Sequence, residues 1–166
     1  MLTDGTHIVF WSCLALILYV YAGYPLLLLS GLLGRRKPVR RGPALPSLSV
    51  LIPAHNEEKT IARKLENVLS SDYPPPLREI LVGDDASTDR TAPIVRSFAR
   101  ENVRLISART RQGKSAIQNE LVANSSGSVL VFTDADCFLP SDALRLLVEN
   151  FADPEVGLVT NRPSVS

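Results

Sequence analysis

Short apolar segments alternate with amphipathic segments along the chain from residue 48 onward. The apolar segments are rich in Val, Ile and Leu, and they cover residues 48–52, 79–83, 103–106, 129–132 and 156–159. The intervening segments place apolar residues at helical spacing, as at Ile61, Leu65 and Val68. Strands joined by helices of this length become parallel neighbours through right-handed crossovers. The alternation predicts an α/β fold with a mostly parallel sheet and helices on both faces.

Polar residues mark the expected starts of the helices. Asn56 is expected to cap the first of them, with Glu57 and Glu58 in a first turn where the helix dipole favours acidic side chains. Residues 87–89 offer capping oxygens for the second helix, and Ser141 is expected to cap the last one.

The segment before the α/β region has a different character. Residues 8–33 contain no charged side chain and are long enough to cross a hydrocarbon core of about 30 Å as a helix. Pro25 is tolerated in membrane helices, and Trp11 suits an interfacial position. A cleavable signal peptide fits poorly, because residues 1–7 carry no Lys or Arg. The segment therefore predicts a permanent membrane helix.

A basic cluster follows this segment, whereas only Asp4 is charged before it; the cluster comprises Arg35, Arg36, Lys37, Arg40 and Arg41. Positive charge collects on the cytoplasmic side of membrane helices. We therefore expect the amino terminus outside and the rest in the cytoplasm, at a bacterial inner or plasma membrane. The predicted regions are a tail at 1–7, a transmembrane helix at 8–33, a basic and proline-rich linker at 34–47 and a domain at 48–166.

Overall charge and cysteine content narrow the class of protein. The net charge is +1, which does not indicate a nucleic acid partner. The two cysteines, Cys13 and Cys137, lack the spacing of metal ligands and do not suggest a disulfide framework. Cys137 is interpreted as a local packing residue and not as a nucleophile.

Residues 129–136 combine a strand with two carboxylates. Residues 129–132 are expected to form a strand buried on both faces, and Asp134 and Asp136 follow it directly. Unpaired buried charge is costly, whereas the carboxyl end of a strand in an open α/β sheet is where ligands bind. Two carboxylates held there could coordinate a hard divalent cation. The alternative is an exposed acidic turn before the next helix.

Other polar residues follow neighbouring strands and should reach the same edge. Asp84 and Asp85 end the second strand, and the segment 53–57 follows the first. Clustered carboxylates repel one another unless a cation or hydrogen-bond donors lie among them, although these aspartates could also be ordinary cap residues. Lys114 supplies a charge suited to phosphate oxygens. A dinucleotide fingerprint is absent, and Ala108 replaces the first glycine that a P-loop would need.

Four motifs occur in an order and spacing that resemble the inverting family 2 glycosyltransferases with a GT-A fold, over roughly residues 47–160. They are PAHNEE at 53–58, DDASTD at 84–89, GKSA at 113–116 and TDAD at 133–136. The resemblance implies a Rossmann-like GT-A domain preceded by one transmembrane helix. It also implies a nucleotide-diphosphate sugar donor, expected to be UDP-linked, a Mg²⁺ or Mn²⁺ ion, and a glycan or lipid acceptor.

The resemblance further implies a role for each matching position. Pro53, Ala54, His55 and Glu57 would border the nucleobase and ribose; Asp85, with Asp84 beside it, would contact the base; Lys114 would lie near the diphosphate; Asp134 would face the ribose or sugar; and Asp136 would hold the metal. His55 stands where the family often has Tyr, and we interpret it as a wall residue.

The family's general base is expected beyond Ser166, so no catalytic residue is predicted within the chain. The Gln-x-x-Arg-Trp motif of processive polysaccharide synthases is also missing. We expect the chain to be the donor-binding part of a longer enzyme. The alternatives are a short protein that binds nucleotide sugar without transferring it, and a membrane-tethered interaction module.

Overall fold

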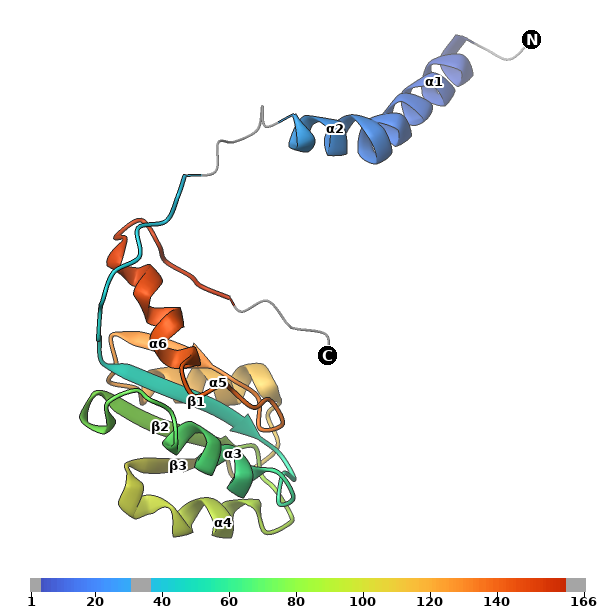
Figure 1. The fold of residues 1–166 in the computed structure, drawn as a ribbon. Coiled ribbons are helices and arrows are strands. Elements are labelled where there is room, and N and C mark those ends of the chain that lie inside the picture. Colours follow the sequence, from blue (N-terminus) through green and yellow to red (C-terminus); the bar gives the residue numbers. More distant parts are fainter. Residues whose placement is uncertain (1–3, 31–36, 161–166) are drawn as a thin grey trace. The chain divides into compact units, whose positions relative to one another are not determined.

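The structure is a computed structural model that describes residues 4–30 and 37–160. It consists of two compact units, Met1–Pro38 and Val39–Ser166, which are described separately (Figure 1). Some sequence predictions fall outside the described residues: the tail residues 1–3, positions 31–33 of the membrane segment, and Arg35 and Arg36 of the basic cluster.

The first unit is a helix interrupted by one π turn. It comprises α1 (Asp4–Leu18), the π turn η1 (Tyr19–Gly23) and α2 (Tyr24–Leu29). The N–H of Tyr24 donates to the carbonyl of Tyr19, which is the wider hydrogen bond of a π turn. Pro25 follows directly and lacks an N–H, so a local π adjustment accommodates it. Gly5–Leu29 is long and apolar enough to cross a membrane, judged by its 25 residues and mean hydropathy of 1.9 alone.

The second unit alternates strands and helices as the sequence predicts. Its strands are β1 (Leu48–Ala54), β2 (Arg78–Asp84), β3 (Val103–Ser107) and β4 (Val129–Phe132). Its α-helices are α3 (Ile61–Leu69), α4 (Thr91–Ser97), α5 (Lys114–Ala123) and α6 (Ala143–Val148). Short 3-10 turns occur at η2 (Pro75–Leu77), η3 (Ala99–Glu101) and η4 (Glu149–Ala152).

The four strands form one parallel sheet in the order β3-β2-β1-β4. Val50 of β1 is aligned with Ile80 of β2 on one side and with Val131 of β4 on the other. Because all the strands are parallel, their carboxyl ends lie along one edge of the sheet. The predicted α/β architecture is confirmed.

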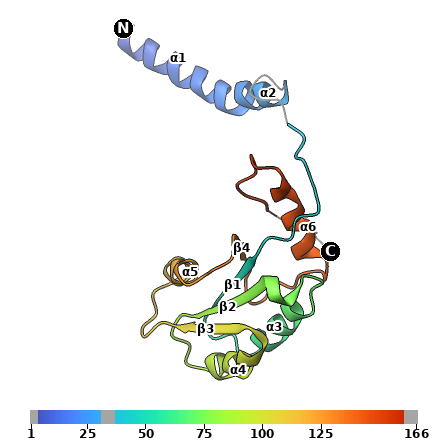
Figure 2. The same cartoon turned by 90° about the vertical axis from the view of Figure 1, so that its left-hand side faces the viewer.

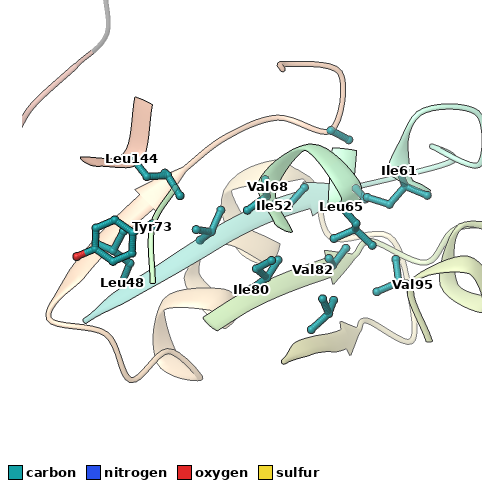
Figure 3. Close-up of a cluster of buried hydrophobic side chains, with 14 of the residues drawn as sticks. Leu48, Ile52, Ile61, Leu65, Val68, Tyr73, Ile80, Val82, Val95 and Leu144 are labelled. Atoms are coloured by element: carbon teal, nitrogen blue, oxygen red, sulfur yellow. The ribbon is translucent and has the colours of Figure 1, made fainter. Parts of the chain in front are cut away.

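Helices cover both faces of the sheet, with α3 and α4 on one side and α5 on the other (Figure 2). Figure 3 shows the larger core, in which Ile61 and Leu65 of α3 pack with Ile52 and Val82 of the sheet. On the opposite face, Leu121 of α5 packs against Leu51 and Leu81. Burial of these side chains supplies the main drive for folding.

Gly83 allows α5 to approach the sheet closely. A Cβ atom at this position would lie 2.6 Å from Cγ1 of Ile117 and 3.1 Å from Leu121. With any larger residue at this position, either α5 or the side chains of Ile117 and Leu121 would have to move.

Residues 129–132 form a strand, as predicted, but the prediction that this strand is buried on both faces is wrong. Within residues 37–160, β4 pairs only with β1, and it therefore forms an edge of the sheet. Its residues are partly buried at most, and Phe132 is 51% exposed. The predicted strand at 156–159 is also wrong, because these residues form no ladder with another described strand and Leu158 is 85% exposed. Apolar composition alone does not make a strand without a neighbouring backbone to pair with.

Two predicted helix caps are also wrong. Asn56 has a left-handed φ of 57° and lies five residues before α3 begins at Ile61, and its side chain binds the loop after β2 instead. Asp142, and not Ser141, precedes α6, and neither helix has a side-chain cap. Residues 87–89 behave more nearly as predicted, because Oδ1 of Asp89 accepts the N–H of Thr91 at the start of α4.

Candidate functional site

A pocket of about 300 Å³ opens at the carboxyl edge of the sheet. It collects residues from the loops after β1, β2 and β4 and from the start of α5. Eight of the nine predicted positions line it: Pro53, Ala54, His55, Glu57, Asp85, Lys114, Asp134 and Asp136. The ninth, Asp84, does not. The structure therefore brings residues from four separate segments to one place.

The loops after β1 and β2 are joined to each other by hydrogen bonds. The Asp85 N–H donates to the carbonyl of Ala54 over 2.9 Å. Asn56 accepts the N–H of Thr88 and donates its own N–H to the Ser87 hydroxyl, both over 2.9 Å. These hydrogen bonds join the two loops into one continuous wall of the pocket. Most acidic and amide groups of this region take part in such bonds.

His55 has a defined proton position in this wall. Its Nδ1 lies 2.7 Å from the carbonyl oxygen of Asp85. A carbonyl only accepts hydrogen bonds, so Nδ1 carries the proton and donates it. Nε2 lies 3.4 Å from the side-chain nitrogen of Asn56, which leaves the ring held on both sides. These contacts tie the imidazole ring of His55 to the two joined loops.

Asp84 and Asp85 have different environments despite being adjacent. Both are buried, but Asp84 does not line the pocket, and its Oδ1 accepts the N–H of Ser87 over 3.1 Å. Asp85 faces the pocket, and its two oxygens accept the N–H groups of Gln112 at 2.6 Å and Gly113 at 2.9 Å. Asp85 thus connects the end of β2 to the loop that begins α5.

These backbone donors affect the titration of Asp85. The hydrogen bond from Gln112 is the main cause that holds the pKa of Asp85 below its ordinary value. Burial opposes this effect, and the N–H of Gly113 with the nearby charges of His55 and Arg111 reinforces it. Asp85 is therefore ionised at neutral pH, with its charge directed at the loop before Lys114.

Lys114 and Asp134 form an ion pair at the pocket. The Nζ atom of Lys114 lies 2.7 Å from Oδ1 of Asp134, and their side chains are 58% and 52% exposed. A pair this exposed contributes little to stability, because water screens it. Both groups therefore remain available to exchange partners with a charged ligand.

Asp136 is exposed and forms no hydrogen bond or ion pair with another residue of the described segments. Across those segments, no group of three or more His, Cys, Asp or Glu side chains could enclose a metal ion. The available donor set is Asp136 with Asp134. A pair of carboxylates fits Mg²⁺ or Mn²⁺, because these ions take oxygen ligands and Mg²⁺ usually keeps waters and substrate phosphates in its shell.

Two charged residues near the pocket carry no prediction from the sequence. Arg111 lines it, and its position in the polar stretch before Gly113 was the available signal. Lys64 is fully buried on α3, behind the turn that carries Asp134 and Asp136. A lysine on the apolar stripe of Ile61, Leu65 and Val68 was the signal that could have revealed it.

Comparison with known families gives a direct match. Residues 49–166 match the family described as Glycosyl transferase family 2. The matched region contains every residue that lines the pocket.

Several curated relatives share this region. The chain is 33% identical to a beta-monoglucosyldiacylglycerol synthase of Synechocystis sp. over 73% of its own length and 26% of the relative's. It is 40% identical to the glycosyltransferase AglE of Haloferax volcanii, over 69% of its own length and 38% of that protein's. The chain thus spans about a quarter to two fifths of the length of these relatives.

Solved structures with the same fold include two that hold nucleotide sugars. The mannosyltransferase PcManGT from Pyrobaculum calidifontis, in complex with GDP-Man and Mn²⁺, aligns with a TM-score of 0.73 and 34% identity, covering 84% of this chain and 43% of that chain. TarS 1-349 of S. aureus, in complex with UDP-GlcNAc, aligns with a TM-score of 0.57 and 29% identity, covering 59% of this chain and 29% of that chain.

Proposed function

Since the chain belongs to glycosyl transferase family 2, we propose that it is the donor-binding part of a membrane-anchored, inverting glycosyltransferase. The donor is a nucleotide-diphosphate sugar, and the acceptor is a glycan or lipid. The observation that carries the proposal is the pocket at the carboxyl edge of the sheet, where His55, Asp85, Lys114, Asp134 and Asp136 meet.

The charges of the pocket suit a nucleoside diphosphate. In this proposal, His55 and the backbone of segment 53–57 form a wall for the nucleobase and ribose, and Asp85 contacts the nucleobase. Lys114 provides the positive charge nearest to the phosphates, exchanging its contact with Asp134 for phosphate oxygens. Asp134 is then free to face the ribose or the sugar.

Asp136, with Asp134 nearby, would hold Mg²⁺ or Mn²⁺. A bound divalent cation supplies charge that stabilises the departing diphosphate. The structural relative in complex with GDP-Man and Mn²⁺ supports the use of a divalent metal ion. We place the general base that activates the acceptor beyond Ser166, so the residues of this chain serve donor binding and leaving-group stabilisation.

UDP is the proposed nucleotide, as the motif resemblance implies. The relatives support nucleotide sugars as a class, because one solved structure holds GDP-Man and another UDP-GlcNAc. The proposed transmembrane helix is Gly5–Leu29, which the apolar length and the absence of buried residues support. The domain that follows is proposed to lie in the cytoplasm, because the basic residues after the helix favour the cytoplasmic side.

Binding of nucleotide in the presence of Mn²⁺ tests this proposal. The complete 166-residue chain, in detergent micelles, would be titrated with UDP and with GDP by calorimetry, with and without Mn²⁺. We expect UDP to bind more tightly than GDP, and Mn²⁺ to strengthen the binding. Asp136→Asn should remove most of the Mn²⁺ effect.

Asp142→Asn is the matched control, because Asp142 lies outside the pocket and makes no side-chain cap. It should bind as the wild type does. Tight binding of GDP alone would replace UDP by GDP in the proposal. Failure to bind either nucleotide would refute the proposed function.

A further inference from the structure

The turn that carries Asp134 and Asp136 is fastened to α3 by polar side chains. Nζ of Lys64 donates to Oγ1 of Thr133 over 2.8 Å and also to the carbonyl oxygen of Cys137. These two contacts lie immediately before and immediately after the Asp-Ala-Asp sequence. One ammonium group therefore closes the turn that displays both carboxylates.

Asn67, three residues along the same helix, extends this contact. Its side-chain nitrogen donates to the carbonyl of Leu139 over 2.9 Å, and its oxygen accepts the N–H of Leu139 over 2.8 Å. Residues three apart on a helix share a face, so Lys64 and Asn67 present one polar edge to the turn. The guanidinium of Arg63 adds a cation–π contact, 4.3 Å from the ring centre of Phe138.

The burial of Lys64 makes this contact unusual. Its side chain is 0% exposed, and burial lowers its pKa while Cys137, Asp134 and Asp136 oppose the shift. Burying an ammonium group is costly unless it is hydrogen-bonded and near opposite charge. A Met would fill the same space without that cost, so the core packing of α3 does not by itself account for a lysine.

The functional side chains anchor this turn only weakly, because the ion pair between Asp134 and Lys114 is exposed to water. Asp134 and Asp136 are exposed, and Ala135 between them is buried in the core that α3 helps to form. Among the described residues of the turn, 133–139, one backbone hydrogen bond joins two of its own members: the Cys137 N–H donates to the Asp134 carbonyl over 3.2 Å. The position of the carboxylates is thus set largely by what holds the flanking residues.

We propose that Lys64 and Asn67 are positioning residues that hold the 133–139 turn in place. Asp134 and Asp136 then form a preformed binding site for the divalent cation of the donor complex. This inference rests on the proposed function. Groups that support metal ligands from behind commonly change metal affinity by about 10- to 100-fold when they are removed.

Asn67→Ala is the more informative variant, because it removes the two hydrogen bonds between Asn67 and Leu139 without changing the charge near the cation. Its side chain is only half-buried, so the domain should fold. Lys64→Met removes the ammonium and keeps a side chain of similar length. Asn124→Ala is the matched control, because the Asn124 side chain bonds only to the carbonyl of Glu120 at the end of α5.

The experiment measures three quantities on the complete chain in micelles. The first is the affinity for Mn²⁺ in the presence of UDP, by electron paramagnetic resonance. The second is the affinity for UDP without metal, and the third is the rate of hydrogen exchange of the amides at 133–139. We expect Asn67→Ala to weaken Mn²⁺ binding about tenfold and to speed exchange of the Leu139 amide. Lys64→Met should weaken Mn²⁺ binding at least as much and speed exchange from Thr133 to Cys137. Metal-free UDP binding should weaken much less than Mn²⁺ binding, and all three quantities should stay unchanged in Asn124→Ala.

Different results would refute different statements. A wild-type chain that binds no Mn²⁺ with either UDP or GDP would refute the proposed function, and with it the role of Lys64 and Asn67 in metal binding. A wild type that binds Mn²⁺ with an affinity that Asn67→Ala and Lys64→Met leave unchanged would refute only the positioning role. An equal loss of Mn²⁺ binding and metal-free UDP binding would also refute it, because the variants would then have disrupted the whole pocket.

Discussion

The ammonium of Lys114 lies 2.7 Å from Oδ1 of Asp134, and both side chains line the same pocket. The two residues come from different elements, since Lys114 begins α5 and Asp134 follows β4. In the absence of a donor, each charge satisfies the other. A diphosphate would compete for Lys114, and a cation would compete for Asp134.

Replacement of Lys114 should therefore affect ligand binding much more than stability. We expect Lys114→Met to weaken the binding of UDP about tenfold, the effect of losing one charge-assisted contact. The melting temperature should hardly change, because the ion pair is exposed. Calorimetry and thermal unfolding would measure both effects. Lys59→Met, at an exposed position outside the pocket, is the control, and an equal loss of affinity there would contradict the role of Lys114.

Asp85 should make the stability of the domain sensitive to acid. A carboxyl group whose pKa is lower in the folded state stabilises the fold above its unfolded pKa, and this contribution is lost as the pH falls through the folded value. The hydrogen bond from Gln112 lowers the pKa of Asp85 from an ordinary value of 3.8, against the opposing effect of burial. The contribution is thus present at neutral pH and disappears below that ordinary value.

Urea unfolding between neutral pH and about pH 3 would measure this contribution. We expect Asp85→Asn to lower the free energy of unfolding by about 2 kcal/mol at neutral pH. The reason is that one of the two backbone N–H groups then faces the NH₂ group of Asn, which cannot accept a hydrogen bond, instead of a carboxylate oxygen. The difference between wild type and variant should shrink as the pH falls. A difference that is constant with pH would show that Asp85 stabilises the loop by something other than its charge.

Gly83→Ala should destabilise the domain through α5. The added methyl group would approach Cγ1 of Ile117 to 2.6 Å, so the helix must move or the side chain must adopt a strained rotamer. Such overpacking costs about 1–3 kcal/mol, which thermal unfolding would detect. Gly157→Ala is the control, because nothing lies within 4 Å of its added Cβ atom. Equal stability of Gly83→Ala and wild type would contradict the close approach of α5 to β2.

The two native cysteines offer a test of membrane orientation. Cys13 lies in α1, within the apolar span, whereas Cys137 is exposed in the second unit. In right-side-out membrane vesicles, a membrane-impermeant maleimide should label Cys137 only after the vesicles are opened, because the domain is expected on the cytoplasmic side. The variant Cys13→Ser leaves Cys137 as the single thiol. Labelling in intact vesicles would reverse the predicted orientation.

Much of the architecture could be predicted from local patterns. The apolar runs that became β1, β2 and β3 and the helical stripe of Ile61, Leu65 and Val68 all form as expected, because periodicity reports which side of an element is buried. The run at 129–132 also became a strand, β4, but not one buried on both faces, and the run at 156–159 formed no strand. An apolar run shows that a segment can be a strand, but only a partner strand decides whether it is central, at an edge, or unpaired.

The parallel α/β plan, the apolar span near the amino terminus and the four motifs at one edge of the sheet follow from local sequence patterns alone. Which carboxylates line the pocket depends on the packing of the domain: Asp84 does not line it, whereas Asp85 does and receives N–H groups from Gln112 and Gly113, which lie 27 and 28 residues further along the chain. The role of Lys64 likewise depends on Thr133 and Cys137, which lie 69 and 73 residues away. The physical reason is that periodicity and motif spacing act over a few residues, while the partners that orient a charged group are brought to it by the packing of the whole domain.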